Sequence, residues 1–226
     1  PRVQLSSVIK GNAYGHGIEQ FVPMAQACGV NHFSVFSADE ALRVQKSLQQ
    51  PATTMIMGYL DTPEMEWALE QGIEFYVFEP DRLEEAARAA KHSGRKARIH
   101  LEVETGMNRT GFDQAGLAHA LAVLSKCNDQ IELKGLCTHF AGAESLQNHE
   151  RILSQQRRFQ EQLQYLKSAG HTPKHRHTAC SAAMVTYPDT HMDMVRVGIM
   201  QYGFWPSPET YREYIAQHQH KKDPLR

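Results

Sequence analysis

Lys10 is the residue whose position most directly suggests covalent chemistry. It ends an apolar run, and a lysine at the inner end of a buried strand is poorly hydrated, which makes its amine available as a Schiff-base nucleophile. Glycines follow at positions 11, 15 and 17, and their freedom suits either a loop that cradles a phosphate or an ordinary tight turn. Tyr14 adds a phenolic donor one helical turn after the lysine. Taken alone, Lys10 also fits a strand-end lysine whose long side chain reaches water.

Four further polar residues end, follow or lie within later apolar runs: Arg109, His139, Ser181 and Arg196, the last of them beside Gly198. A guanidinium suits the planar recognition of a carboxylate or phosphate. Each residue also has a purely structural alternative. His139 alone would more often be a hydrogen-bonded core histidine, and Arg196 alone a member of a buried ion pair.

The elements that would position these residues follow from the periodicity of the chain. Short β-rich runs alternate with amphipathic segments, which is typical of repeated βα units around a parallel sheet. Eight such runs are present: Val3 to Lys10, His32 to Ser37, Thr53 to Met57, Phe75 to Phe78, Ala97 to Val103, Leu133 to Thr138, His175 to Thr178, and Met194 to Ile199. Helical patterns lie between them, such as Pro63 to Gln71 before Gly72 and Arg82 to His92 before Gly94.

Eight βα units favour an α/β fold of the (β/α)8 TIM-barrel type over a doubly wound open sheet, which at this length more usually has about five or six strands. In such a barrel the carboxyl ends of all strands meet at one face, and phosphate sites form from the loops after strands seven and eight. We expect the barrel to span residues 1–203. Residues 204–226 are expected to be a polar linker or the start of a further domain, with His218, His220, Lys221 and Lys222 near its end.

Several segments resemble the alanine racemase family. Val8 to Gly17 resembles the motif V-K-A-x-A-Y-G-H-G, Val103 to Phe112 is similar to V-D-T-G-M-x-R-x-G-F, Thr138 to Ala141 to T-H-F-A, Ser181 to Ala183 to S-A-A, and Met194 to Gly203 to M-V-R-x-G-I-x-x-Y-G. These matches occur in order over nearly the whole chain. The chain is therefore identified as a member of this family and resembles its N-terminal, pyridoxal-phosphate-binding barrel domain.

The resemblance implies a role for each candidate residue. Lys10 would be the Schiff-base lysine of pyridoxal 5′-phosphate and the catalytic base on one face of the substrate. Arg109 would contact the cofactor phenolic oxygen and the substrate carboxylate. Arg196 would face the pyridine nitrogen and form a hydrogen bond with His139. The cofactor phosphate would be held by Tyr14, Ser181, Gly198 and Ile199.

The resemblance also implies the reaction, the interconversion of L- and D-alanine for D-alanine biosynthesis, with serine as a second candidate substrate. A permanently charged arginine leaves the pyridine nitrogen unprotonated, which favours racemisation over transamination. In the family, the base on the opposite face is a tyrosine from a second, β-rich domain of the partner subunit, and no segment here matches it. We therefore expect a fragment without that C-terminal β domain, with little turnover by itself, and a homodimeric full-length protein. Alternatives are another pyridoxal-phosphate enzyme of this barrel fold or a non-catalytic pyridoxal-phosphate-binding protein.

Glu102 is a departure from the family pattern. Seven residues before the motif arginine, many alanine racemases have a carbamylated lysine that orients this arginine. Charged and apolar residues alternate along Ala97 to Val103, so Glu102 should point into the barrel. We expect its carboxylate to replace the carbamate and to pair directly with Arg109. An ion pair with Arg98 is the alternative.

Composition excludes several other classes of protein. The 226 residues carry a formal net charge of −1, which gives no reason to expect nucleic acid as a partner. No run of about 20 apolar residues is present that would span a membrane. The four cysteines are scattered, as is typical of reduced thiols, and a cytoplasmic protein is expected. Since His171, His175 and His177 lack companions at metal-ligand spacing, we expect them at the surface or at strand edges, and we expect no metal site.

Overall fold

The computed structural model describes residues 3–218 and 223–225. It contains one parallel sheet of eight strands: β1 (Gln4–Val8), β2 (His32–Val35), β3 (Thr53–Ile56), β4 (Glu74–Val77), β5 (Ala97–Glu102), β6 (Ile131–Cys137), β7 (His175–His177) and β8 (Met194–Val197). The strand order is β7-β6-β5-β4-β3-β2-β1-β8, so the strands from β1 to β7 pair in sequence and β1 also pairs with β8. The eight predicted β runs are thus confirmed as the strands of a nearly closed (β/α)8 barrel.

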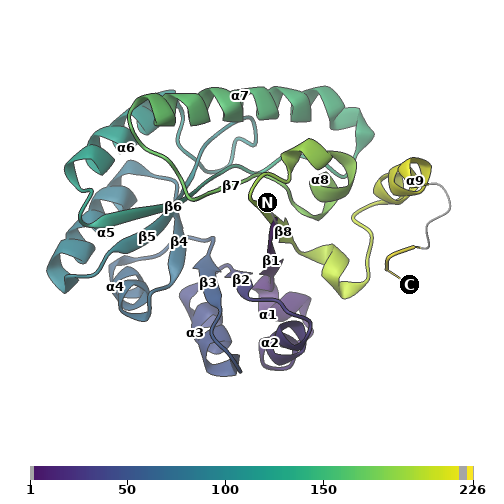
Figure 1. Ribbon diagram of the computed structural model, residues 1–226, viewed down its shortest axis with the longest axis horizontal. Helices are drawn as coiled ribbons and strands as arrows, with labels where there is room; N and C mark the ends of the chain where they lie inside the picture. Colours follow the sequence, from purple (N-terminus) through teal and green to yellow (C-terminus); the bar gives the residue numbers. More distant parts are fainter. Residues whose placement is uncertain (1–2, 219–222, 226) are drawn as a thin grey trace.

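Helices follow the strands and cover the outside of the sheet (Figure 1). They are α1 (Lys10–Tyr14), α2 (Ile18–Ala27), α3 (Ala38–Ser47), α4 (Thr62–Gln71), α5 (Pro80–Ser93), α6 (Gln114–Lys126), α7 (His149–Ser168), α8 (Ser181–Thr186) and α9 (Pro208–Gln217), with short 3-10 turns η1 (Leu146–Asn148), η2 (Pro188–Thr190) and η3 (Ile199–Tyr202). None of the helices in these described ranges is long and apolar enough to cross a membrane.

Local sequence signals set the helix ends. Helix α4 begins with a capping box in which Asp61 accepts from the Glu64 amide and Glu64 accepts from the Asp61 amide. It ends at Gly72, which has the left-handed conformation expected of a helix stop, and α5 ends in the same way at Gly94. Both predicted helices are therefore confirmed, with slightly earlier starts.

Successive side chains along each strand point alternately towards the outer helices and into the barrel interior. In β5, Ala97, Ile99 and Leu101 join the large apolar cluster that packs sheet against helices. His100 and Glu102 face the opposite way and are buried in the barrel. The predicted inward direction of Glu102 is thus confirmed.

The junction between β7 and β8, which we call the β7–β8 seam, lacks a regular strand ladder in the described residues. Two backbone hydrogen bonds cross it, from the Asp193 amide to the Arg176 carbonyl (3.1 Å) and from the Arg196 amide to the Ala179 carbonyl (3.0 Å). The side chains of Arg176 and Asp193 add an ion pair of 2.7 Å. Side chains therefore contribute much of the closure at this junction.

The segment after residue 203 contains α9, which lies beside α8 and apart from the sheet (Figure 1). Trp205 packs against Tyr211 and Tyr214. It thereby joins this segment to a second apolar cluster, which includes Phe140 and Val197. The boundary at residue 203 stays a prediction. His220, Lys221 and Lys222 lie outside the described residues.

Candidate active site

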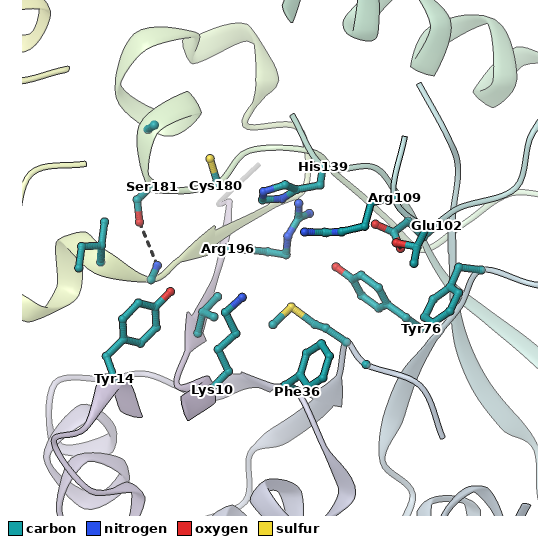
Figure 2. Close-up of a pocket in the computed structure, with 18 of the residues that line it drawn as sticks. Lys10, Tyr14, Phe36, Tyr76, Glu102, Arg109, His139, Cys180, Ser181 and Arg196 are labelled. Atoms are coloured by element: carbon teal, nitrogen blue, oxygen red, sulfur yellow. Dashed lines mark hydrogen bonds between the residues drawn. The ribbon is translucent and has the colours of Figure 1, made fainter. Parts of the chain in front are cut away.

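A cavity of about 750 Å³ opens at the carboxyl ends of the strands, a size typical of small-molecule sites. Figure 2 shows side chains from opposite walls that converge on it. It is lined by every residue predicted for the site: Lys10, Tyr14, Glu102, Arg109, His139, Ser181, Arg196, Gly198 and Ile199. The structure therefore brings these residues together, while their individual roles remain predictions.

Lys10 lies two residues after the end of β1 and does not extend the strand as predicted. The backbone turns there, and the next four residues take left-handed φ values, 62° at Gly11, 55° at Asn12, 54° at Ala13 and 54° at Tyr14. L-residues avoid this region at a cost of roughly 1–2 kcal/mol each, and consecutive left-handed residues are uncommon. We call residues 11–14 the left-handed turn. Strain of this kind persists only where surrounding contacts hold it.

Those contacts come from α3. The two carboxylate oxygens of Glu40 accept from the amides of Asn12 (3.1 Å) and Phe36 (2.9 Å). Arg43 donates to the Asn12 side-chain oxygen (2.6 Å) and pairs with both oxygens of Glu19 (2.7 Å each). The left-handed turn is thus fixed to the loop after β2, and this fixes the base of Lys10.

Tyr14, Ser181 and Gly198 meet at one end of the cavity. The Ser181 hydroxyl accepts from the Gly198 amide at 2.9 Å (Figure 2). A Cβ atom at Gly198 would lie only 2.6 Å from the Tyr14 hydroxyl, so glycine is required for this close approach. Burial and the nearby Cys180 thiol raise the pKa of Tyr14, which keeps its hydroxyl protonated as a donor. Hydroxyl and amide donors that cluster in this way suit a phosphate.

Arg109 projects from a loop that leaves and rejoins the end of β5. The Glu104 amide donates to the Phe112 carbonyl and the Phe112 amide to the Glu102 carbonyl, each at 2.9 Å, which closes the loop at its base. Neither the Arg109 guanidinium nor the Lys10 amine forms a hydrogen bond or ion pair with another described residue. Two cations without protein partners in one cavity favour an anionic ligand.

Arg196 has the opposite environment, because it is buried and saturated with acceptors. Its Nη1 donates to the His177 carbonyl and to His177 Nδ1, each at 2.7 Å. Its Nη2 donates to the carbonyls of Thr138 (2.9 Å) and Thr178 (3.2 Å). A guanidinium has five N–H donors, so these four bonds leave the Nε–H as the remaining one.

One prediction about the histidines was wrong. His177 ends β7, a strand at the edge of the sheet, but its side chain points into the barrel interior and is fully buried. It also takes the place predicted for His139 as the hydrogen-bond partner of Arg196, and no hydrogen bond joins His139 and Arg196, both of which are described. Burial together with the charges of Arg196, Arg109 and Lys10 lowers the pKa of His139 to about 3, so its imidazole is neutral.

The predicted direct pair between Glu102 and Arg109 is also absent, although both residues are described. No ion pair within 4.0 Å joins them, and a Glu102 oxygen instead accepts from the Thr110 hydroxyl at 2.8 Å. Burial raises the pKa of Glu102, while the Thr110 bond and the charges of Arg109 and Arg196 oppose this rise. The neighbouring Thr110 satisfies the carboxylate first, so Arg109 acts on it only at longer range.

A polar cluster that the sequence did not predict lies beneath the cavity. Glu74, His100 and His177 are buried and hydrogen-bonded in series, and Tyr76 lies above them in the cavity wall. The available signal was the inward position of His100, two residues before Glu102 on β5. Across the described residues, no group of histidine, cysteine, aspartate or glutamate side chains has the arrangement of a metal site.

The fold and these side chains first define a class: a (β/α)8 barrel that presents a lysine amine, two arginines and a phosphate-sized donor cluster to one cavity. Comparison with known proteins then identifies the family. Residues 1–206 match the family described as "Alanine racemase, N-terminal domain". The chain belongs to the alanine racemase family.

Individual relatives agree with this assignment. The alanine racemase of Leptospira interrogans is 34% identical over 210 residues, which are 93% of this chain and 53% of that protein. The solved structure of alanine racemase from the D-cycloserine producer Streptomyces lavendulae has a TM-score of 0.87 at 34% identity, and it covers 96% of this chain and 56% of that chain. The Bacillus anthracis enzyme with bound L-Ala-P gives 0.83 at 32% identity, with 92% and 53% covered. The chain thus spans about half the length of the relatives it matches.

Alanine racemases depend on pyridoxal phosphate, and the residues of this cavity fit that group. Gly198 has no side chain, so a ligand can come close to its backbone beside Ser181 and Tyr14. A Cβ atom at this position would clash with the Tyr14 hydroxyl. Lys10 and Arg109 offer charges that form no ion pair or hydrogen bond with a described residue. Arg196 offers one remaining donor from a fixed position. The phosphate, the carbonyl carbon, the phenolic oxygen and the ring nitrogen of the cofactor each have a matching partner in this set.

Proposed function

We propose that this chain is the cofactor-binding barrel of a pyridoxal-phosphate-dependent amino-acid racemase that interconverts L- and D-alanine. One observation carries the proposal: a fixed, permanently charged Arg196 on β8 and the Lys10 amine after the neighbouring strand β1 line the same cavity (Figure 2). The names of the relatives support the choice of substrate. Solved relatives are described with cycloserine and with L-Ala-P, both small amino-acid analogues.

Bound pyridoxal phosphate supplies an electron sink that acidifies the amino acid at Cα. The residues of the chain divide the remaining tasks. Tyr14, Ser181 and the backbone at Gly198 and Ile199 hold the phosphate. Lys10 would hold the cofactor carbon covalently and would move the Cα proton on one face.

The two arginines set the direction of the chemistry. Arg109, with its guanidinium free of protein partners, binds the carboxylate of the substrate and the cofactor phenolic oxygen. Arg196 can only donate and does not give up its proton, so it leaves the ring nitrogen unprotonated. A weaker electron sink favours the prompt return of the proton to Cα, which is racemisation, over transamination. His139 is neutral and therefore adds no charge to the part of the cavity around the two arginines.

Racemisation needs a second proton donor on the opposite face of Cα. By analogy with the family, this donor comes from a β-rich domain of a partner subunit, so the active protein is a homodimer. Its substrates are small amino acids, alanine first and serine second. The scattered cysteines support a cytoplasmic location.

The test uses the protein as the cell makes it. We expect turnover of both L- and D-alanine, and we expect borohydride treatment of the cofactor-loaded protein to fix the cofactor on the peptide that contains Lys10, as read by mass spectrometry. Lys10→Ala should abolish both, whereas the exposed Lys96→Ala should change neither. Cofactor fixed on another lysine would overturn the assignment of Lys10. Cofactor binding without turnover of either alanine would instead support a non-catalytic pyridoxal-phosphate-binding protein.

A further inference from the structure

A chain of three hydrogen bonds runs through the barrel interior beneath the cavity. Glu74 Oε2 lies 2.9 Å from His100 Nε2, His100 Nδ1 lies 2.8 Å from His177 Nε2, and His177 Nδ1 lies 2.7 Å from Arg196 Nη1. The four residues come from β4, β5, β7 and β8, and each is at least 94% buried. The chain therefore crosses the barrel from one side to the other and ends on the arginine of the site.

The chemistry of its two ends fixes the direction of every bond. Arginine is only a donor, so His177 Nδ1 must accept from Arg196 and carries no proton. The proton of His177 is then on Nε2, which donates to His100 Nδ1. His100 in turn carries its proton on Nε2 and donates it to the Glu74 carboxylate. Both histidines are thus neutral, with the proton on Nε2.

Charge balance around Glu74 keeps this arrangement in place. Its Oε1 lies 3.2 Å from Arg98 Nη2 and 3.3 Å from Lys134 Nζ, and His32 Nε2 lies 3.9 Å from its Oε2. Although burial acts in the opposite direction, contacts with His100 and His32 and the charge of Lys134 hold the pKa of Glu74 well below its usual range. Burial lowers the pKa of His100 to about 4. The carboxylate is ionised and accepts, while the imidazole stays neutral and donates.

We propose that Glu74 is a positioning residue of the site, which acts through His100 and His177 to hold the Arg196 guanidinium in one orientation. A protonated His177 Nδ1 would place an N–H against the Nη1–H of Arg196 and break that bond. The guanidinium would then be free to rotate and to present a different N–H to the cavity. Glu74 excludes this tautomer through His100. Its carboxylate accepts from His100 Nε2–H, which leaves His100 Nδ1 without a proton, and His177 Nε2–H must then donate to that nitrogen.

Two substitutions separate this role from simple charge balance. Glu74→Gln and Glu74→Met both remove the negative charge beside Arg98 and Lys134. Only glutamine retains an oxygen that accepts from His100 Nε2. The two variants therefore form a matched pair in which charge is constant and the acceptor differs.

The first measurement reads the tautomers directly, from the side-chain nitrogen chemical shifts of ¹⁵N-histidine-labelled protein. In the unmodified protein we expect a protonated Nε2 and an unprotonated Nδ1 at both His100 and His177. Glu74→Gln should keep this pattern, and Glu74→Met should give a mixture. A protonated Nδ1 or an imidazolium at either residue of the unmodified protein would overturn the proposal, even where the variants fail to fold.

The second measurement is kinetic, and it rests on the proposed racemase function. Because residues that orient a functional group through hydrogen bonds, as around metal ligands, commonly affect activity by about tenfold or more, we expect kcat for alanine to fall at least about tenfold further in Glu74→Met than in Glu74→Gln, with KM little changed. Equal tautomer patterns and equal kcat in the two variants would show that Glu74 acts only through its negative charge, and this would refute the proposal. Failure of the racemase assay alone would leave the tautomer measurement valid, so the two proposals fail separately.

Discussion

The two walls of the cavity position their reactive groups by different means. The Lys10 wall uses backbone conformation: a left-handed turn is held to α3 by Glu40 and Arg43, and the lysine side chain itself is exposed. The Arg196 wall uses side-chain hydrogen bonds: an ordinary strand carries a buried arginine that has four bonds to protein acceptors. The difference matches the tasks. In the proposed function, the lysine must retain rotamer freedom to reach its target, whereas the arginine proposed to face the cofactor ring must keep one orientation.

The strongest test of this comparison is acidification, because the buried histidines belong to the Arg196 wall. Burial lowers the pKa of His100 to about 4, that of His139 to about 3, and that of His177 well below its usual value. Below the unfolded value of about 6.5, the unfolded chain binds protons that the folded chain does not, so stability falls as pH falls. We expect the free energy of unfolding to drop on the order of 5 kcal/mol between pH 6.5 and 4.5, as measured by urea titration.

A matched pair of variants localises this acid sensitivity. His139→Asn should reduce the drop by about a third, since one of three histidines no longer takes up a proton on unfolding. The exposed His119→Asn should leave it unchanged. If the free energy of unfolding drops equally in the unmodified protein, His139→Asn and His119→Asn, the acid sensitivity comes from elsewhere in the chain.

The next effect in size concerns the contacts that hold the left-handed turn. In Glu40→Gln, one of the two accepting oxygens becomes an NH₂ group that faces a backbone N–H, so we expect a loss of about 2 kcal/mol in the free energy of unfolding. The amides of Asn12 and Phe36 should also exchange faster with deuterium. Glu70→Gln, at an exposed position on α4, serves as the control. Unchanged exchange at both amides would show that Glu40 does not hold the turn.

The smallest effect isolates backbone strain. Gly11 and Gly94 have similar positive φ values, 62° and 67°, and a Cβ atom at either would meet nothing within 4 Å. Alanine at each position should therefore cost roughly 1 kcal/mol from conformation alone. Thermal or urea unfolding of Gly11→Ala and Gly94→Ala should show equal losses. A cost at Gly94 with none at Gly11 would mean that the turn relaxes when its first residue changes.

Sequence patterns predicted the barrel and the cavity because both follow from periodicity. The eight β runs place Lys10, Arg109 and Arg196 at the same face, and any parallel barrel would do so. The glycine at position 198 was identifiable from its motif, and the structure adds the reason, its contact distance to Tyr14.

The partners of these residues were much harder to predict. Arg196 bonds to His177 rather than to His139 because β7 ends after three residues and its last side chain turns inward, a detail of strand length. Glu102 bonds to Thr110 because the loop of Arg109 folds back over β5. The series from Glu74 to His177 joins three strands and depends on register. Such contacts are set by packing across the barrel, and a single sequence does not encode them locally.

The β7–β8 seam gives Arg196 a second part to play. Seven strand pairings in the described chain form backbone ladders, while at the seam the guanidinium of a β8 residue bonds to carbonyls at the ends of β6 and β7. Arg196 therefore joins β8 to β6 and β7, in addition to the ligand contact proposed for it. Any ligand that binds to this arginine also favours the closed cylinder, so occupancy and closure reinforce each other by mass action. The barrel should accordingly open first at the β7–β8 seam. A bound ligand should slow hydrogen exchange at this seam more than at the β3–β4 pairing on the opposite side of the barrel.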